Sequence, residues 1–139
     1  MRLKIKKLSE KAKLPIKHNP NDAAFDLHSL ENLILPSSQT KIIHTGVCME
    51  IPKGYYGQIE SRSSMAAKGI FVTGGVIDSG YRGEIMIITN NFSSSDYTIN
   101  EGERIAQIVF HKVKHFDLLE VEAIDEENDR GGGLGSSGL

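Results

Sequence analysis

The chain has 139 residues, a net charge of −2 at pH 7, and 14 glycines, 4 prolines, 1 cysteine and no tryptophan. This length suffices for one domain with a hydrophobic core, and the charge excludes a general attraction to nucleic acid or to a membrane surface. The lone Cys48 excludes an internal disulfide, and neither a signal-peptide pattern nor a membrane span is present. We therefore expect a soluble intracellular protein, cytoplasmic or nuclear, that makes no membrane contact and binds no nucleic acid directly.

Short apolar runs, separated by glycine, proline and polar turns, follow one another along most of the chain. Leu3 and Ile5 alternate with lysines, which is typical of a half-buried strand. The β-branched residues of the later runs also favour strands over long helices. The run Ile-Met-Ile-Ile at 85–88 predicts burial on both faces, at a contact between two sheets or two subunits. The predicted strands are residues 3–8, 23–29, 33–35, 41–51, 55–60, 84–91, 102–110 and 118–124.

One short helix is predicted at residues 63–69, with Ser63 as its N-cap and Gly69 at its end. Free amides at the start of a helix, two hydroxyls and the guanidinium of Arg62 beside them are typical of an anion site, especially for phosphate. The alternative is a capped turn next to a surface arginine.

Two polar residues interrupt apolar strands. Asp26 lies in the run 23–29, where an acid costs free energy unless it is paired, solvated or close to a cation. Gln107 lies among apolar neighbours in the run 102–110, and its amide needs partners in the backbone or in a ligand. Both are therefore candidate site residues.

The stretch Gly-Val-Ile-Asp-Ser-Gly-Tyr-Arg-Gly-Glu at 75–84 is where we expect the chemistry. An extended chain would turn Asp78 and Tyr81 to opposite faces, whereas a tight turn at the glycines could bring both to one cavity. We expect residues 70–81 to form a β-hairpin whose tip or inner edge faces that cavity. The alternative is an ordinary hairpin connection, for which Asp-Ser-Gly is also typical.

Residues 129–139 contain too few apolar side chains to fold by themselves. They carry Arg130, many glycine amides and two hydroxyls, which could wrap phosphates and become ordered on binding. A disordered tail without function is the alternative.

Five of these segments, in this order, resemble the motifs of trimeric dUTPases. The resemblance runs from residue 23 to residue 138, and five motifs in order are far more specific than any one of them. The matching segments are Ala-Ala-Phe-Asp-Leu at 23–27, Arg-Ser-Ser-Met-Ala at 62–66, the stretch 75–84, Gly-Glu-Arg-Ile-Ala-Gln at 102–107, and Arg130 with Gly-Leu-Gly-Ser-Ser-Gly at 133–138.

The resemblance implies an all-β fold, a distorted jelly-roll-like β-barrel of the β-clip type with one short helix and a flexible C-terminal arm. The barrel domain would span residues 1–124, and residues 125–139 would form the arm that closes over a site of the trimer. Three chains would share three active sites that hydrolyse dUTP to dUMP and pyrophosphate with Mg²⁺ as cofactor. This reaction would limit uracil incorporation into DNA and supply dUMP for dTMP synthesis.

The resemblance also implies roles for individual residues. Asp78 would be the base that activates water for attack on the α-phosphorus, and Tyr81 would pack under the deoxyribose and select against UTP. Backbone groups around Gly75 would read uracil, and Asp26 would hold Mg²⁺ through its water shell. The residues implied in phosphate binding and in closure of the arm are Arg62, Ser63, Ser64, Gln107, Arg130, Leu134, Gly135 and Ser136.

Three departures from the family pattern stand out. Leu134 occupies the place of the aromatic ring that the family usually lays over uracil, and the run from Arg130 to it is one residue shorter. Ser64 stands where glycine is common, and Gly80 replaces a frequent second acid. Two alternatives are a dCTP deaminase-like enzyme, which would use a glutamate to activate water, and a non-catalytic dUTP-binding regulatory protein. An aspartate at 78 favours the hydrolase over both.

Overall fold

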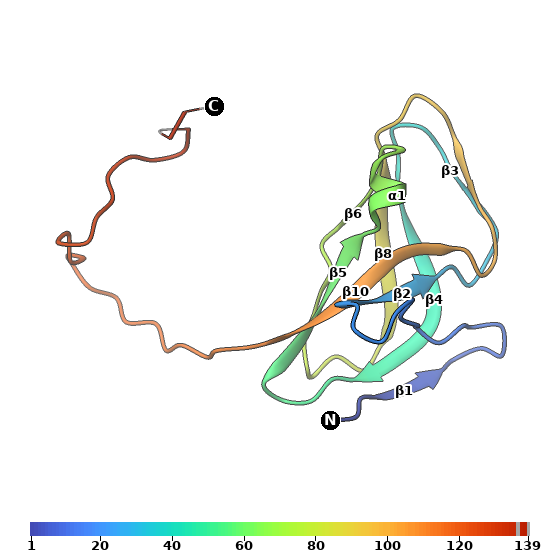
Figure 1. Ribbon diagram of the computed structural model, residues 1–139, viewed down its shortest axis with the longest axis horizontal. Coiled ribbons are helices and arrows are strands. Elements are labelled where there is room, and N and C mark those ends of the chain that lie inside the picture. Colours follow the sequence, from blue (N-terminus) through green and yellow to red (C-terminus); the bar gives the residue numbers. More distant parts are fainter. Residues whose placement is uncertain (136, 139) are drawn as a thin grey trace.

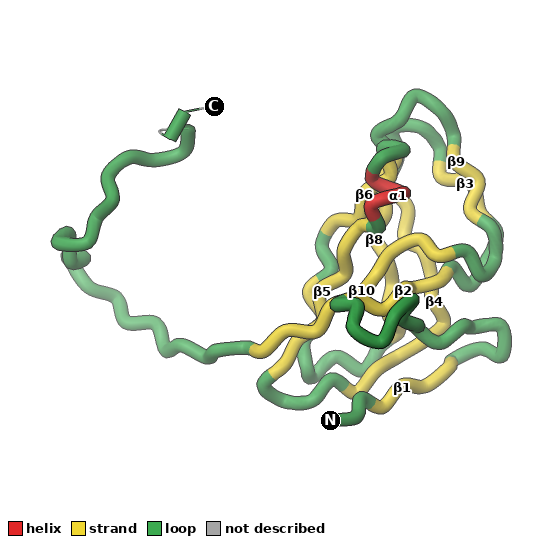
Figure 2. Tube along the Cα trace, viewed as in Figure 1, coloured by secondary structure: helices red, strands yellow, loops and turns green. Residues whose placement is uncertain are grey.

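The computed structural model describes residues 1–135, 137 and 138, in which two four-stranded antiparallel sheets form the body of the molecule (Figure 1). The first sheet has the order β1 (Lys4–Lys7), β4 (Thr40–Glu50), β8 (Glu84–Asn91) and β6 (Ile70–Thr73). The second has the order β2 (Ala24–His28), β10 (Arg104–Lys112), β5 (Tyr55–Ser61) and β7 (Val76–Ile77). A separate ribbon pairs β3 (Leu33–Leu35) with β9 (Tyr97–Ile99) (Figure 2). The predicted all-β, jelly-roll-like fold is confirmed.

One hydrophobic core joins the two large sheets, because each contributes the apolar face of its strands. The first sheet supplies Ile43 and Ile87, and the second supplies Leu27 and Ile108, all of them at most 1% exposed. This core fixes the strands whose opposite faces and ends carry the polar residues of interest.

Within the single chain, the side chains of strand β8 alternate between core and surface, so the contact between the two sheets buries only one face, and the predicted alternative of a contact between subunits stays a prediction. Ile85 and Ile87 are fully buried, whereas Met86 and Ile88 are each 39% exposed. The period-two geometry of a strand separates them. The single chain therefore leaves an apolar strip uncovered on this sheet.

The predicted helix is present as α1 (Ser63–Ala66), but its N-cap is Arg62, and no side chain caps it. Arg62 has an extended backbone and accepts the backbone N–H groups of Met65 and Ala66, so the helix begins one residue earlier than the serine pattern predicts. Gly69 ends the helical segment with φ of 84°, a conformation that glycine adopts without strain. No helix in the described part of the chain is long and apolar enough to cross a membrane.

The predicted β-hairpin over residues 70–81 is wrong, because its two strands belong to different sheets. Strand β6 pairs with β8, and β7 pairs with β5. Gly74 and Gly75 lie between them with φ of 67° and 96°, and they carry the chain from one sheet to the other. The segment is a corner of the barrel, and residues 78–83 leave it as a loop.

After β10 the described chain forms no further strand or helix, so the strand predicted at 118–124 is absent. Figures 1 and 2 show residues 114–135 running away from the barrel as an extended arm. Leu118 and Leu119 are 98% and 84% exposed. A strand needs a partner for its backbone groups, and the single chain offers this segment none.

Candidate active site

A polar pocket of about 600 Å³ lies where β2, β10 and the start of α1 meet. It gathers residues from three sequence segments that are far apart along the chain. Every phosphate or metal candidate that the sequence placed outside the arm lines it. The polar side chains discussed below are Asp26, Arg62, Ser63, Ser64, Arg104 and Gln107.

Strand pairing explains how these residues meet. Gln107 on β10 lies directly opposite Asp26 on β2, and on its other side β10 pairs with β5, which leads into Arg62. The Gln107 amide donates a hydrogen bond of 3.1 Å to the carbonyl of Ser61. The half-buried amide therefore finds a backbone partner while it stays at the pocket wall.

Asp26 is held between two guanidinium groups. Its Oδ1 lies 3.3 Å from Nε of Arg62, and its Oδ2 lies 3.4 Å from Nη1 of Arg104. Arg62 also donates a hydrogen bond of 3.1 Å to the carbonyl of Arg104. The Asp26 side chain is only 14% exposed, so this pairing satisfies an acid that the strand pattern alone left unexplained. Asp22 also lines the pocket, so its two arginines are balanced by two aspartates, but the guanidinium N–H groups and the serine hydroxyls still offer donors to an oxyanion such as phosphate.

Arg104 is a site residue that the sequence reasoning missed. Residues three apart on a regular strand point to opposite faces, so Arg104 and Gln107 were not expected in one pocket. The register of β10 against β2 shifts between Arg104 and Ala106, and this irregularity changes the alternation. The only signal in the sequence is the presence of Arg104 within the motif at 102–107.

His28 lies behind this pocket, two residues beyond Asp26 on β2 and only 5% exposed. Its Nδ1 has no hydrogen-bond partner among the described residues. Burial first, and then the charge of Lys13, lower the pKa of His28; Asp26 opposes this, while Arg104 and Arg62 add to the lowering. Because an unperturbed histidine titrates near pH ~6.5, the ring is neutral at pH 7.

A second pocket of about 280 Å³ lies at the barrel corner, between β6, β7 and the exposed side of β8. It is lined by Gly75, Asp78 and Tyr81, so the glycine-rich stretch does bring its acid and its aromatic ring to one cavity. The backbone N–H of Tyr81 donates to the carbonyl of Asp78 at 3.0 Å, which closes the tight turn between them. We call this cavity the corner pocket.

The backbone of the corner pocket depends on glycine at two positions. Gly75 accepts a 2.8 Å hydrogen bond from the N–H of Ile59, and a Cβ at residue 75 would lie 2.9 Å from the Ile59 carbonyl oxygen. A Cβ at Gly83 would lie 2.6 Å from the hydroxyl of Tyr81. That hydroxyl donates a 2.7 Å hydrogen bond to the carbonyl of Glu84, which fixes the ring over the glycine.

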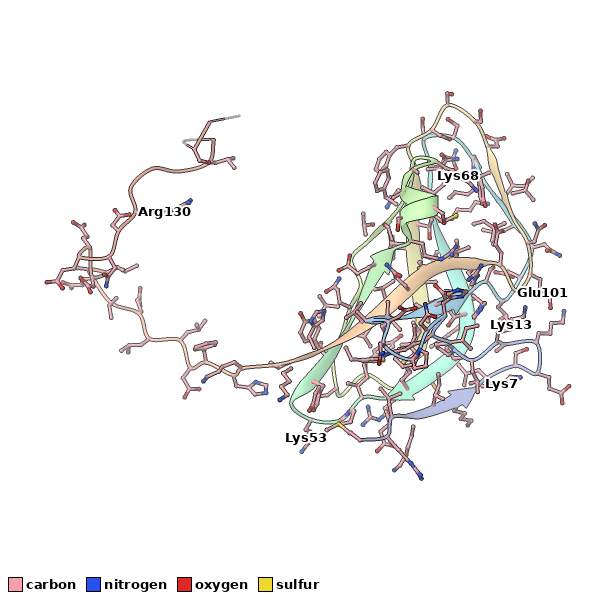
Figure 3. The ribbon with its side chains drawn as sticks, viewed as in Figure 1. Lys7, Lys13, Lys53, Lys68, Glu101 and Arg130 are labelled. Carbon is pink, nitrogen blue, oxygen red and sulfur yellow. The ribbon has the colours of Figure 1, made fainter. Side chains whose placement is uncertain are left out.

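The two pockets have no lining residue in common. The predicted arm residues Arg130, Leu134 and Gly135 are exposed and line neither pocket. Figure 3 shows Arg130 far out on the arm. Ser136, the remaining predicted arm residue, lies outside the described residues. The described chain thus places the candidate site residues in three separate regions.

The carboxylate of Asp26 is suited to a metal ion that is held mainly by the phosphate oxygens of a bound ligand. Among the described residues, no group of three or more His, Cys, Asp and Glu side chains could hold an ion. Both oxygens of Asp26 already face guanidinium groups. A Mg²⁺ ion keeps several waters and prefers one or two carboxylates together with phosphate oxygens, so Asp26 suits contact through water.

Comparison with known proteins identifies the family of the chain. The family model for dUTPase matches residues 10–138. A deoxyuridine 5'-triphosphate nucleotidohydrolase of Nautilia profundicola is 44% identical over 141 residues, which covers 99% of each chain. The enzyme of the same name from Fowlpox virus is 40% identical over 96% of this chain and 94% of its own.

Solved structures extend the likeness to three dimensions. The dUTPase of Staphylococcus bacteriophage 80alpha with dUpNHpp matches with a TM-score of 0.92 and 30% identity, over 99% of each chain. A dUTPase of phage phi11 of S. aureus, which coordinates a structural Mg(II) ion, matches with a TM-score of 0.85 and 28% identity, over 90% of this chain and 99% of that one.

Proposed function

The chain belongs to the dUTPase family, and we propose that it forms a homotrimer in which different subunits supply the polar pocket, the corner pocket and the arm of each active site. The chain is a dUTP diphosphatase, which hydrolyses dUTP to dUMP and pyrophosphate with Mg²⁺ as cofactor. By removing dUTP it limits uracil incorporation into DNA and supplies dUMP for dTMP synthesis. A cytoplasmic or nuclear location, where DNA precursors are made, fits this role.

The observation that supports shared sites is the separation of the pockets within one chain. The base-and-sugar candidates Asp78 and Tyr81 line the corner pocket, whereas the phosphate candidates line the polar pocket. A nucleoside triphosphate needs both sets at once. A second copy that brings its polar pocket to the corner pocket of the first would complete the site, as closed symmetric oligomers allow.

Uncovered apolar surface also supports assembly. Ile42, Met86 and Ile88 on the outer face of β4 and β8 are 54%, 39% and 39% exposed, and they border the corner pocket. Such a strip on an isolated subunit is typical of a surface that another protein covers.

The barrel has an apolar groove, and the arm carries apolar side chains that could fill such a groove. An apolar groove of about 400 Å³ is lined by residues that include Leu3, Ile5, Phe25, Met49 and Phe110. The arm segment 116–124 carries apolar side chains that its own barrel does not cover. We propose that this segment lies in the groove of a neighbouring subunit, which would also give its backbone a partner.

In the proposed mechanism Asp78 is the general base. It takes a proton from a water molecule while the water oxygen forms a bond to the α-phosphorus, and the bond between that phosphorus and the bridging oxygen to the β-phosphate breaks. Pyrophosphate leaves with the electron pair of that bond. Bound Mg²⁺ would neutralise phosphate charge, and Asp26 would hold it through water.

The other residues bind and align the nucleotide. Arg62, Ser63, Ser64 and Gln107 donate hydrogen bonds to phosphate oxygens. Arg130, Leu134, Gly135 and Ser136 close over the substrate, so that bulk water is excluded and the α-phosphorus is aligned.

Specificity arises in the corner pocket. The ring of Tyr81 supports the deoxyribose and leaves no room for a 2'-hydroxyl, which rejects UTP. Backbone groups around Gly75 read uracil, which has an acceptor at O4 and a donor at N3, whereas cytosine has the reverse arrangement. A fixed backbone pair rejects cytosine because it would leave polar groups unpaired. The family relationship does not favour a dCTP deaminase.

A pyrophosphate-release assay with dUTP, UTP, dTTP and dCTP tests the substrate. Of these four nucleotides, we expect only dUTP to be hydrolysed rapidly. Asp78→Asn should nearly abolish turnover and leave binding of a non-hydrolysable dUTP analogue intact. Unchanged turnover in this variant would exclude Asp78 as the base.

Subunit complementation tests the shared site. Asp78→Asn and Arg62→Ala homotrimers should each be inactive, because each lacks one essential group in every site. After unfolding and refolding as an equal mixture, about one quarter of the sites should combine an intact Asp78 from one subunit with an intact Arg62 from another. No recovery of activity would show that each site is built within one chain.

A further inference from the structure

A third pocket, which the proposed mechanism does not use, lies beside the corner pocket and is lined by cations. It has a volume of about 310 Å³ and lies between β1, the loop after β4 and the loop that follows Asp78. Figure 3 shows Lys53, which lies in the loop after β4, at the foot of the barrel. We call it the basic pocket; its charged residues are Arg2, Lys4, Lys53, Arg82 and one acid, Glu50.

The positive charge of the basic pocket is mostly uncompensated. Lys4 and Glu50 form an exposed ion pair at 3.5 Å, and Arg82 donates to the backbone carbonyls of its own loop. Within the described residues, Arg2 and Lys53 have no ion-pair partner. A chain with a net charge of −2 therefore carries a local cationic depression next to its catalytic loop.

The arm carries the complementary charge. Residues 125–129, Asp-Glu-Glu-Asn-Asp, contain four acids, and all are exposed. Two of their carboxylates accept only backbone N–H groups of the arm itself. No ion pair involves any of the four in the described part of the chain. We call this stretch the acidic segment.

The order of the segments along the arm matches the order of the pockets on the barrel. The arm has its apolar residues at 116–124, then the acidic segment, and then Arg130 with the glycine-rich end. On the barrel, the apolar groove and the basic pocket share Arg2, Ile51 and Pro52. The basic pocket in turn includes Ser79 and Gly80, which lie between Asp78 and Tyr81 of the corner pocket.

We propose that the acidic segment of one subunit binds in the basic pocket of another and anchors the arm beside the catalytic loop. The inference rests on the proposed homotrimer, and it adds the contact that would hold the arm in register. An arm fixed at this point would start its glycine-rich end next to the corner pocket. Docking on a second copy fits the path of the arm, which leaves its own barrel (Figure 1).

Cross-linking tests the contact directly. Lys53→Cys and Glu126→Cys, introduced together in a Cys48→Ala background, are treated with a short bis-maleimide, and the products are separated under denaturing conditions. We expect covalent dimers and trimers. The control pair Lys41→Cys with Glu126→Cys should give only monomers. A cross-link confined to monomers would overturn docking between subunits, and no cross-link would overturn docking altogether.

Charge reversal tests its role in turnover. Lys53→Glu should raise the KM for dUTP about three- to tenfold at low salt, with kcat changed less, since surface ion pairs are individually weak. Glu126→Lys should do the same, and the double variant should recover. The difference from wild type should shrink in high salt, and the control Lys41→Glu should match wild type.

These outcomes separate the anchor from the proposed function. If wild type fails to release pyrophosphate from dUTP, the proposed function fails whatever the cross-linking shows. If wild type hydrolyses dUTP but Lys53→Glu and Glu126→Lys leave KM unchanged and no intersubunit cross-link forms, only the anchor fails.

Discussion

At the scale of single residues, the polar pocket is organised by one acid between two cations. Asp26 pairs with Arg62 at 3.3 Å and with Arg104 at 3.4 Å. Arg62 is proposed to bind phosphate, so its position depends on the groups that hold it. Arg104 helps to hold Arg62 in two ways. Its side chain pairs with the Asp26 carboxylate that contacts Arg62, and its backbone carbonyl accepts a hydrogen bond from Arg62. We infer that Arg104 is a positioning residue.

Arg104→Gln should raise the KM for dUTP and for Mg²⁺ while changing kcat less. Asp26 would lose one of its two guanidinium partners and hold Arg62 less firmly. Because the Arg104 side chain is 46% exposed, the loss in free energy of unfolding should be below about 1 kcal/mol. Steady-state kinetics against both ligands, together with urea unfolding, measure this.

The control for this prediction is Arg104→Lys, which keeps the charge but loses the planar fork, so an intermediate KM is expected. Identical kinetics for wild type and Arg104→Gln would contradict the role in positioning.

His28 predicts how stability depends on pH. Its pKa is lowered in the fold by burial and by Lys13, Arg104 and Arg62, against the opposing effect of Asp26. The unfolded chain therefore binds this proton more readily than the folded one. The free energy of unfolding should fall as pH drops below about 6.5, until the pH reaches the folded-state pKa.

Denaturant unfolding of the metal-free protein between about pH 7.5 and pH 5 measures how the free energy of unfolding changes with pH. This pH range covers the titration of histidine. His28→Gln should show a shallower slope over the same range. Equal slopes for both proteins would mean that His28 does not carry the effect.

At the scale of elements, the corner between β6 and β7 is the feature that places Asp78 and Tyr81. Gly75 has φ of 96°, and any Cβ there would press on the Ile59 carbonyl. Gly75→Ala should therefore lower the free energy of unfolding by about 1–3 kcal/mol and reduce dUTP turnover.

Gly80→Ala is the matched control for this corner, because a Cβ at Gly80 would meet no atom within 4 Å. Its free energy of unfolding should stay close to that of wild type. Thermal unfolding and pyrophosphate release compare the two variants, and equal effects of both substitutions would contradict the importance of the corner.

The elements also show what sequence patterns can and cannot predict. Nine of the ten strands and the one short helix follow from apolar runs and turn residues, because those signals are local; β9 was not predicted. Pairing partners are not local: β6 and β7 look like a hairpin in sequence, yet each joins a different sheet. Arg104 was missed because a register shift reversed its face, and periodicity carries no trace of such a shift.

The segment 118–124 failed as a strand for a different reason. Its apolar pattern is real, but a strand forms only against a partner, and none of the described residues of the same chain pairs with it. The roles of Asp78, Tyr81 and the arm came from the family motifs, because spacing alone cannot show which pockets approach one another in an assembly.

At the scale of the whole molecule, the barrel and the arm are separable parts. Among the described residues, the core contains none beyond β10, and no arm residue lines the polar pocket, the corner pocket or the basic pocket. The arm therefore contributes to the proposed site only through assembly.

Deletion of residues 129–139 should leave the barrel folded and the trimer intact, yet reduce kcat/KM for dUTP about a hundredfold, since closure of the arm aligns the α-phosphorus. Circular dichroism, sedimentation and pyrophosphate release measure the three properties. Full activity of the truncated protein would contradict the role of the arm.

The absence of any shared lining residue between the polar and corner pockets has a genetic consequence. In the proposed homotrimer, each working centre would draw on polypeptides from more than one gene copy whenever two alleles are expressed together. A single faulty residue would then disable only the centres that receive it, so two alleles with defects in different pockets would complement each other.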